Sequence, residues 1–167
     1  QNPEATIVAG ATDVGLWVTK FMRDISPVIF TSRLKDFRKI EVSDTAITVD
    51  GGASYTEMLA VLDEHLPQLS HFWRRIGGEQ VRNMGTVGGN IANGSPIGDT
   101  PPPLIALGAT ITLRKGDERR TLELEKYFIT YGKQDRVAGE IVEQIHIPLP
   151  DEDQLFACYK ISKRRDE

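Results

Sequence analysis

The sequence predicts an α+β fold in which a small parallel βαβ unit precedes a longer, mainly antiparallel part. Three observations support this. The first 30 residues alternate a short β-rich run, a helical apolar stripe and a second β-rich run. Later, runs of alternating apolar and polar residues occur in pairs, and a capping pattern marks a long helix between them. A chain of 167 residues, 40% apolar and 26% charged, can form one compact domain or two small lobes.

The N-terminal unit begins with the β-rich run "TIVA" (6–9), which stops at Gly10. The apolar residues behind it keep the i, i+3, i+4, i+7 spacing of one helix face: Val14, Trp17, Val18 and Phe21. Thr12 or Asp13 is expected to cap this helix. The run "PVIF" (27–30) reads as a second strand. A strand, a helix and a strand within so few residues favour a parallel pair with a helical crossover.

Two alternating runs follow, "KIEVSD" and "AITVDGG", and they predict a hairpin that turns at Ser43 and Asp44. Ser54 and Glu57 have the spacing of a capping box. The helix they begin has apolar residues at helical spacing and is expected to end at Pro67. These apolar residues are Tyr55, Met58, Leu59, Leu62 and Leu66.

The second half contains three further predicted elements. "PPLIALGA" reads as a short helix ended by Gly108, and the next run as a hairpin turning at Lys115 to Glu118. "GEIVEQIHIPLP" (139–150) alternates as one more strand, which its two prolines should stop. The α/β order at the start thus changes to a mostly antiparallel α+β order.

Composition excludes several classes of function. A net charge of −4 argues against a nucleic-acid partner, because neutralising phosphates requires clustered Lys and Arg. The single cysteine, Cys158, excludes an internal disulfide and a cysteine cage for zinc or an iron–sulfur cluster. His65, His71 and His146 lack ligand spacing, so no metal site is assigned. No signal peptide or long apolar span is present, which predicts a cytoplasmic protein without membrane contact. The abrupt ends suggest a fragment of a longer polypeptide.

The loop "VAGATDVG" (8–15) lies between the first strand and the first helix. Backbone amides at such a turn, together with the helix dipole, can hold an anion. The loop lacks the G-x-x-G of a dinucleotide fingerprint and the Gly-Lys-Ser/Thr of a P-loop. Taken alone, it fits an ordinary helix cap equally well.

A second segment, Arg82 to Pro103, contains five glycines, four prolines and three asparagines. We expect it to be a long loop without helix or strand, in which Gly85, Gly88 and Gly89 form a nest of amides for a phosphate or diphosphate. Its short polar side chains could bond a ribitol, a ribose or a ring edge: Asn90, Asn93, Ser95 and Asp99. The alternative is a surface loop rich in turn formers. Two anion-binding loops in one chain would suit a diphosphate-bridged dinucleotide.

Residues 7–20, 76–109 and 158–167 closely resemble the FAD-binding domain of the xanthine dehydrogenase family. The resemblance covers essentially the whole chain and is closest to the small subunit of the bacterial enzymes. It implies the two-lobed FAD-binding fold of the vanillyl-alcohol oxidase and p-cresol methylhydroxylase type, with FAD extended between the lobes. Residues 1–52 would form the N-terminal lobe and residues 53–155 the second lobe. Residues 156–167 would begin the linker to a further C-terminal domain.

The resemblance also implies the residues that bind the cofactor. The first diphosphate loop comprises Val8, Ala9, Gly10, Ala11, Thr12, Asp13 and Val14, where a methyl at Ala11 is tolerated if its φ is negative. The second comprises Thr86, Gly88, Gly89, Asn90 and Ile91. Asn93 adds a polar side chain, while Ser95 and Asp99 match the segment that bonds the ribityl and adenosine side. Ile76 stands where some relatives place an aromatic ring over the adenine, and Ile141 matches a position whose backbone approaches the flavin or adenine.

Lys160 matches a lysine that lies near the flavin ring in this family. Reduced flavin carries negative charge at N1 and O2, and a nearby ammonium stabilises that charge and raises the reduction potential. The last residues match the start of a charged loop beside the flavin: Arg164, Arg165, Asp166 and Glu167. No side chain is expected to act as an acid, base or nucleophile.

The resemblance implies an electron-transfer module of a molybdenum hydroxylase, xanthine dehydrogenase, that takes electrons from [2Fe-2S] clusters and passes them to NAD⁺ or O₂. The clusters and the molybdopterin would lie on other segments or chains. One alternative is the flavin subunit of a sister enzyme acting on carbon monoxide, nicotinate or hydroxybenzoyl-CoA, although "NGSPIGDTPP" is more like the xanthine version. Others are a flavin-free interaction module and an enzyme that binds a mononucleotide through one loop. We expect Asp99→Ala and Gly89→Val to lower flavin content, the valine more strongly.

Overall fold

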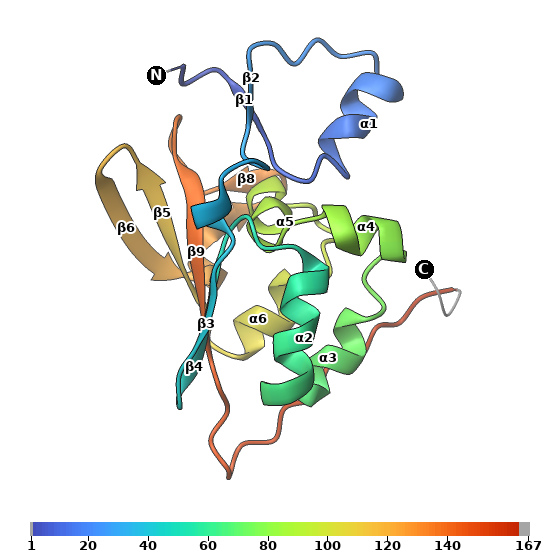
Figure 1. The fold of residues 1–167 in the computed structure, drawn as a ribbon, viewed down its shortest axis with the longest axis vertical. Coiled ribbons are helices and arrows are strands. Elements are labelled where there is room, and N and C mark those ends of the chain that lie inside the picture. Colours follow the sequence, from blue (N-terminus) through green and yellow to red (C-terminus); the bar gives the residue numbers. More distant parts are fainter. Residues whose placement is uncertain (1, 164–167) are drawn as a thin grey trace.

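A computed structural model describes residues 2–163. The N-terminal lobe contains β1 (Thr6–Val8), α1 (Val14–Thr19) and β2 (Val28–Phe30), and the two strands pair in parallel with Ile7 opposite Ile29. The predicted βαβ unit is confirmed, and Figure 1 shows it standing apart at one end of the molecule. The apolar stripe of α1 is not packed into a core, since Val18 is 42% exposed and Phe21, beyond the helix end, is 64% exposed.

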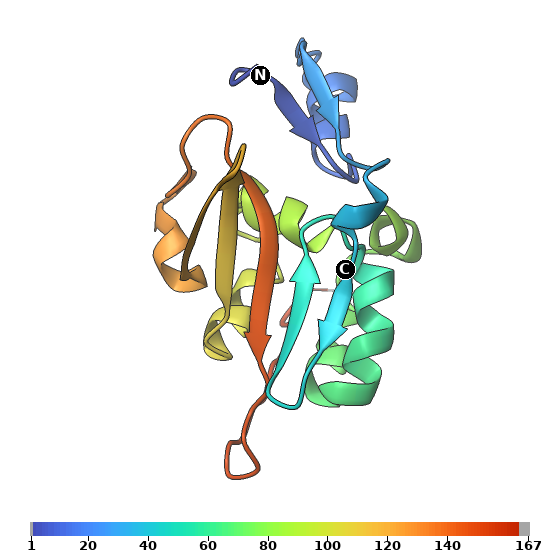
Figure 2. The ribbon, with the colours of Figure 1, turned by 60° about the vertical axis from the view of Figure 1, so that its left-hand side comes forward.

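A five-stranded antiparallel sheet forms the centre of the second lobe, in the order β3-β4-β9-β5-β6 (Figure 2). The strands are β3 (Ile40–Val42), β4 (Ala46–Asp50), β5 (Thr110–Lys115), β6 (Glu118–Glu123) and β9 (Ile141–Pro148). Both predicted hairpins and the last predicted strand are confirmed. β9 lies between β4 and β5, where Ile147 pairs with Ile47 and Ile145 pairs with Ile111.

The β3–β4 hairpin, which lies before the lobe boundary predicted at residue 52, pairs within this large sheet. β4 pairs with β9 along its whole length, from Ala46 to Asp50. Its inward side chains, Ile47 and Val49, are fully buried. Local sequence could not show this, because the partner strand comes almost 100 residues later.

Helices cover one face of the sheet (Figures 1 and 2). They are α2 (Tyr55–His65), α3 (Pro67–Trp73), α4 (Glu79–Met84), α5 (Val87–Asn93) and α6 (Pro101–Ala106). The capping box is present: Ser54 Oγ accepts from the Glu57 amide, and the Glu57 carboxylate accepts from the Ser54 amide. Pro67 follows the end of α2 as predicted, and it also begins α3, where its missing N–H costs nothing.

Trp73 anchors α3 to α2. Its side chain is fully buried, its indole N–H donates to the Tyr55 carbonyl at 3.1 Å, and its ring meets the Tyr55 ring edge-on at 5.5 Å. This pair lies next to Gly85, since the Tyr55 amide donates to the Gly85 carbonyl at 3.1 Å. The core of the second lobe therefore holds the backbone just before α5 in place.

The segment from Arg82 to Pro103 is mostly helical, and the predicted long loop is wrong. It contains the end of α4, all of α5 and the start of α6. Three residues of types that are common in loops act as helix signals here. Thr86 caps α5 by accepting from the Gly89 amide at 3.1 Å, and Gly94 ends it at a φ of 59°. Pro101 opens α6, leaving only residues 94–100 as a connecting loop.

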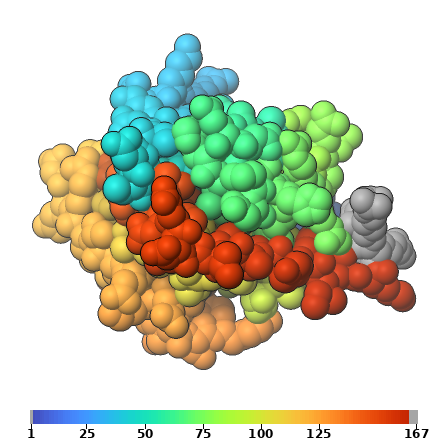
Figure 3. All heavy atoms as spheres, turned by 90° about the horizontal axis from the view of Figure 1, so that it is seen from below, coloured from blue at the N-terminus to red at the C-terminus, as the bar shows by residue number. Residues whose placement is uncertain are grey.

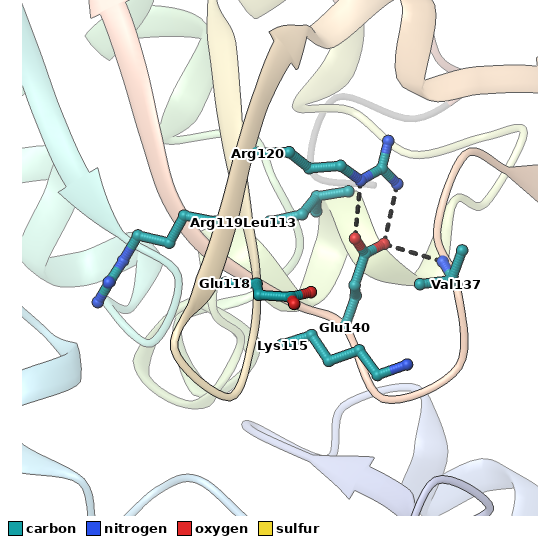
Figure 4. Close-up of a pocket in the computed structure, with 7 residues that line it drawn as sticks. All are labelled: Leu113, Lys115, Glu118, Arg119, Arg120, Val137 and Glu140. Carbon is teal, nitrogen blue, oxygen red and sulfur yellow. Dashed lines mark hydrogen bonds and ion pairs between the residues drawn. The ribbon is translucent and has the colours of Figure 1, made fainter.

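The sequence did not indicate α7 (Leu124–Tyr127), β7 (Phe128–Thr130) or β8 (Lys133–Gln134). The chain after β8 is tied back to β6 by Arg120, whose guanidinium bonds the Glu140 carboxylate at 2.7 and 2.9 Å. Figure 4 shows the two side chains facing each other in a pocket at the rim of the sheet, with Glu140 also accepting from the Val137 amide. Asp135 pairs with the same guanidinium.

Glu140→Gln is expected to lower the free energy of unfolding by about 1–2 kcal/mol at neutral pH, less than for a fully buried pair because the Arg120 side chain is 38% exposed. The hydrogen bonds from Arg120 lower the pKa of Glu140. A carboxylate with a lowered pKa stabilises the fold above its unfolded pKa of about 4.3, and this is lost as the pH falls through the folded value. Urea unfolding should therefore show the full difference at pH 7 and a smaller difference at pH 3.5.

The control for this variant is Glu123→Gln, whose partner Lys126 lies on the surface with a side chain 67% exposed. It should leave the free energy of unfolding at the wild-type value, because an ion pair this exposed is screened by water. An equal loss in Glu140→Gln at both pH values would contradict the ionic role of this carboxylate.

The segment from 150 to 163, which we call the strap, follows β9 and runs across the lower face of the molecule (Figure 3). From residue 155 its side chains alternate in exposure. Leu155, Tyr159 and Ile161 are at least 83% exposed. The intervening side chains are half-buried against the body: Phe156, Cys158, Lys160 and Ser162.

Within residues 2–163, no helix has the length and apolar character needed to cross a membrane. The same part of the chain contains no group of three or more His, Cys, Asp and Glu side chains that could hold a metal ion.

Candidate functional site

The two glycine-containing segments meet at Gly10. A Cβ at this position would lie 2.6 Å from the carbonyl carbon of Met84 and 2.9 Å from Cα of Gly85, and closer still to the Met84 oxygen. The backbones are therefore in direct contact, which only glycine permits. Gly89 faces the same loop, since its Cβ would lie 3.8 Å from that of Ala9. The tertiary structure thus brings the two predicted diphosphate segments together.

The first loop offers unused hydrogen-bond donors. Among the described residues, the amides of Gly10, Ala11, Thr12 and Asp13 donate to no protein group. Ala11 to Asp13 are exposed, and the loop closes into α1 through the bond from the Gly15 amide to the Ala11 carbonyl at 2.8 Å. Successive free amides in a turn of this kind suit an anion such as a diphosphate.

Ala11 has a φ of 58°, so the negative φ at which a methyl group is expected to be tolerated is not the one it adopts. The left-handed conformation costs an L-residue about 1–2 kcal/mol relative to the right-handed one. Ala11 directly follows the tight contact at Gly10, and the chain enters α1 three residues later. The methyl group is exposed, so the cost is conformational and not steric crowding by neighbours.

Ala11→Gly is expected to leave FAD affinity unchanged or to raise it up to about fivefold, because glycine removes the left-handed penalty at an entropic cost of about 0.5–1 kcal/mol. Ala11→Val should weaken binding, since a β-branched residue resists positive φ. Titration of each variant with FAD, followed by flavin fluorescence, measures both effects. Weaker binding by the glycine variant than by the wild type would contradict this account of the loop.

In the second segment, glycines allow close contact between backbones, but their amides do not form a nest of free donors. The amides of Val87 and Gly88 donate to the carbonyls of Ala53 and Gly51 at 2.9 and 3.0 Å, and the Gly89 amide donates to Thr86. The nest predicted there is therefore not formed by these groups, because the second lobe already satisfies them. A Cβ on Gly88 would lie 2.5 Å from Cα of Gly51, so this glycine permits the α5 backbone to touch the β4–α2 turn.

The polar residues of α5 and the following loop have different environments. The Asn90 amide oxygen accepts from the Thr100 hydroxyl at 2.5 Å, which holds the ends of the 94–100 loop together. Ser95 is half-buried and Asn93 exposed, so both can reach a ligand. Ile91 is fully buried in the core, and its side chain supports the helix without facing the surface.

Asp99 and Lys160 form an ion pair, 2.9 Å from Oδ2 to Nζ, with side chains 28% and 14% exposed. The Lys160 ammonium also donates to the Arg75 carbonyl at 3.0 Å. The lysine expected near the flavin ring therefore lies beside the carboxylate expected on the ribityl and adenosine side. These two positions are 61 residues apart in the sequence.

Ile76 and Ile141 are the two remaining residues predicted to lie near the cofactor. Ile76 is 5% exposed and belongs to the core cluster, so its side chain packs inside the second lobe. Ile141 is half-buried at the start of β9, next to the Val142 carbonyl that leaves no room for a Cβ on Gly51. Because Gly51 also touches Gly88, the start of β9 lies behind the N-terminus of α5.

Two residues of this region are not indicated by the sequence patterns described above: Gly51 and Arg75. Gly51 separates the α5 N-terminus from β9, and the signal that could have found it is the pair of glycines directly after an alternating strand. Arg75 bonds the strap, which no local pattern indicates. Arg164 to Glu167, the predicted charged loop, lie outside the described residues.

The residues present fit FAD. An elongated ligand with a diphosphate needs free donors, a close backbone approach, polar groups along its length and a cation near an electron-rich ring. The free donors are the amides of Gly10 to Asp13, and the close backbone approach is the contact at Gly10. The polar groups are the side chains from Asn93 to Asp99, and the cation is Lys160.

Comparison with known proteins agrees with this. Residues 1–150 match the family described as the FAD binding domain in molybdopterin dehydrogenase. Nicotinate hydroxylase of Emericella nidulans is 30% identical over 185 residues, 100% of this chain and 14% of that protein. The FAD-subunit of nicotinate dehydrogenase from Eubacterium barkeri is 29% identical, over 95% of this chain and 55% of the subunit. Xanthine dehydrogenase/oxidase of Gallus gallus is 28% identical over 100% of this chain and 13% of the enzyme.

Solved structures share the fold. Carbon monoxide dehydrogenase from Hydrogenophaga pseudoflava superposes with a TM-score of 0.90 at 23% identity, covering 98% of this chain and 58% of that one. Quinoline 2-oxidoreductase from Pseudomonas putida 86 gives a TM-score of 0.86 at 20% identity, covering 99% and 58%. This chain thus spans only part of the length of these proteins. With the two-lobed fold and the resemblance to the xanthine dehydrogenase family both confirmed, the chain belongs to the family of FAD-binding domains of molybdopterin dehydrogenases.

Proposed function

We propose that this chain is the electron-transfer module of a molybdenum hydroxylase of the xanthine dehydrogenase type. The observation that carries the proposal is the contact at Gly10, which joins a loop of free amides to the segment before α5. A packing interface has no need of unpaired amides on an exposed turn, so this contact favours a ligand site over a flavin-free interaction module.

In this proposal the residues of the chain bind, orient and tune the cofactor. The amides of Gly10 to Asp13 hold the diphosphate, and Ser95 and Asp99 bond the ribityl side. Lys160 places a cation next to the ring, where it favours the reduced form. When bound, FAD supplies the redox chemistry that links one-electron carriers to a two-electron acceptor.

The partners follow from this role and are part of the proposal. Electrons come from [2Fe-2S] clusters, which draw them from a molybdopterin site where the substrate is oxidised. NAD⁺ or O₂ is the acceptor, and the enzyme is cytoplasmic. Clusters and molybdopterin lie on other segments or chains, because the single cysteine cannot ligate a cluster.

Xanthine is the proposed reducing substrate of the whole enzyme, because "NGSPIGDTPP" is like the xanthine version of this segment. Nicotinate is the second candidate, favoured by the 30% identity to a nicotinate hydroxylase. The assembled enzyme would decide between them by its activity on each heterocycle.

The first test is the visible absorbance spectrum of the purified chain before and after addition of FAD and desalting. Retained flavin bands are expected, with lower occupancy in Asp99→Ala and lowest in Gly89→Val. A valine Cβ would lie 2.5 Å from Thr86 Oγ1 and disturb the cap of α5, whereas Asp99→Ala removes one polar contact and the partner of Lys160. Asp44→Ala, exposed at the β3–β4 turn, is the control. Equal flavin content in all four proteins would contradict the site and favour the interaction module.

A further inference from the structure

Arg75 holds the strap to the second lobe. Its guanidinium donates to the Lys160 carbonyl at 2.8 Å and to the Ser162 hydroxyl at 3.2 Å. In return, the Lys160 ammonium donates to the Arg75 carbonyl at 3.0 Å. Each residue thus binds the backbone of the other, and this reciprocal pairing sets the position of residue 160 along α3.

The Arg75 end of this pairing is rigid. Arg75 follows α3 directly, its amide donates to the Phe72 carbonyl at 2.9 Å, and it stands between the buried Trp73 and Ile76. The strap end is not rigid by itself. No backbone amide from residue 155 to 163 donates to another described backbone group, so no strand ladder keeps it in place.

The ammonium of Lys160 sits on a flexible four-carbon stem and reaches Asp99 only while the strap keeps its position. We propose that Arg75 is a positioning residue, which fixes Lys160 beside Asp99 and thereby sets the charge that the flavin ring meets. This inference rests on the proposed function and names a residue that neither glycine segment contains.

Arg75 acts through Lys160, which makes a double-variant test possible. In the flavin-loaded full-length subunit, Arg75→Gln and Lys160→Met should each shift the flavin midpoint potential in the negative direction. The double variant should equal Lys160→Met alone, because nothing remains for Arg75 to position. Arg75→Lys keeps the charge but cannot bridge Lys160 and Ser162, and should lie between wild type and Arg75→Gln.

Arg74→Gln is the matched control. Arg74 is the neighbouring residue, and its guanidinium bonds the exposed Asp63 of α2 at 2.6 and 2.7 Å. Its removal should leave the potential at the wild-type value. A wild-type potential in Arg75→Gln, or shifts that add in the double variant, would overturn the proposal.

A second readout does not depend on flavin. In the FAD-free subunit, trypsin should cleave the strap after Lys163 about tenfold faster in Arg75→Gln than in Arg74→Gln, because the charge-assisted bond to the Lys160 carbonyl no longer holds the strap against the second lobe. Equal cleavage rates in the two variants overturn the inference even if no FAD is bound. A subunit that never takes up FAD but shows the difference in cleavage contradicts the proposed function and leaves the positioning role of Arg75 standing.

Discussion

Replacing Gly10 by alanine is expected to weaken FAD binding by about 10- to 100-fold, the equivalent of the 1–3 kcal/mol that overpacking of a tight contact costs. The added Cβ would meet three backbone atoms of Met84 and Gly85, which cannot rotate away as a side chain can. Titration with FAD, followed by flavin fluorescence, measures the loss. It is the sharpest test of the contact that joins the two lobes.

Neither side of this contact can yield without a further loss. On one side β1 is paired with β2, and Val8 is 3% exposed. On the other, the Gly85 carbonyl accepts from the Tyr55 amide, and Tyr55 packs on the buried Trp73. The N-terminal lobe therefore has to move as a unit, which carries the free amides away from α5. Unfolding of the second lobe should change little, because its sheet and helices are untouched.

Gly15→Ala is the matched control, because a Cβ on Gly15 meets nothing within 4 Å. Gly15 lies inside α1, so alanine should stabilise that helix by about 0.5–1 kcal/mol and leave FAD affinity unchanged. If Gly10→Ala bound FAD as tightly as Gly15→Ala, the close approach of the two segments would have no part in the site.

Gly88→Ala should have the second large effect, which is on the free energy of unfolding of the second lobe. Its Cβ would lie 2.5 to 2.9 Å from three backbone atoms of Gly51, and Gly51 is itself pressed against the Val142 carbonyl of β9. Three backbone layers are thus in contact inside the second lobe. We expect a loss of about 1–3 kcal/mol in the free energy of unfolding, measured by urea denaturation, together with weaker FAD binding.

Gly89→Ala is the control for Gly88→Ala, because it tests whether any alanine in this part of α5 lowers the free energy of unfolding. The nearest atom to its Cβ is the Thr86 hydroxyl, a side-chain group at 2.5 Å that can rotate away at the cost of the cap, about 1 kcal/mol. Gly88→Ala should therefore be the less stable of the two. The reverse order would show that capping, and not the contact with Gly51, limits the stability of this region.

Local sequence patterns were sufficient for most of the individual elements. The Ser54–Glu57 capping box, the turn at Ser43 and Asp44, and the end of α2 at Pro67 were predicted and are present. Each depends on residues a few positions apart, whose propensities act in any context. The loop from Val8 to Val14 is likewise a candidate anion site by its sequence, and among the described residues its amides from Gly10 to Asp13 donate to no protein group.

The segment from Arg82 to Pro103 shows where local reasoning failed. The high content of glycine and proline indicates a loop. In the structure, however, Thr86 caps α5, Gly94 ends it, and Pro101 begins α6. The short α5 is stabilised by carbonyls of Ala53 and Gly51, which accept from its first amides. Helices this short are not stable from propensity alone, so only these tertiary partners decide the outcome.

By itself, then, the sequence determined the type of most elements, the two glycine segments and the family to which they belong. The tertiary structure alone decided that the β3–β4 hairpin joins the large sheet, that Gly10 touches Met84, and that Arg75 and Asp99 hold Lys160. All three are contacts between residues far apart in the chain. Their energies depend on which surfaces folding brings together. The spacing of residues along the sequence does not show which residues are close together in space.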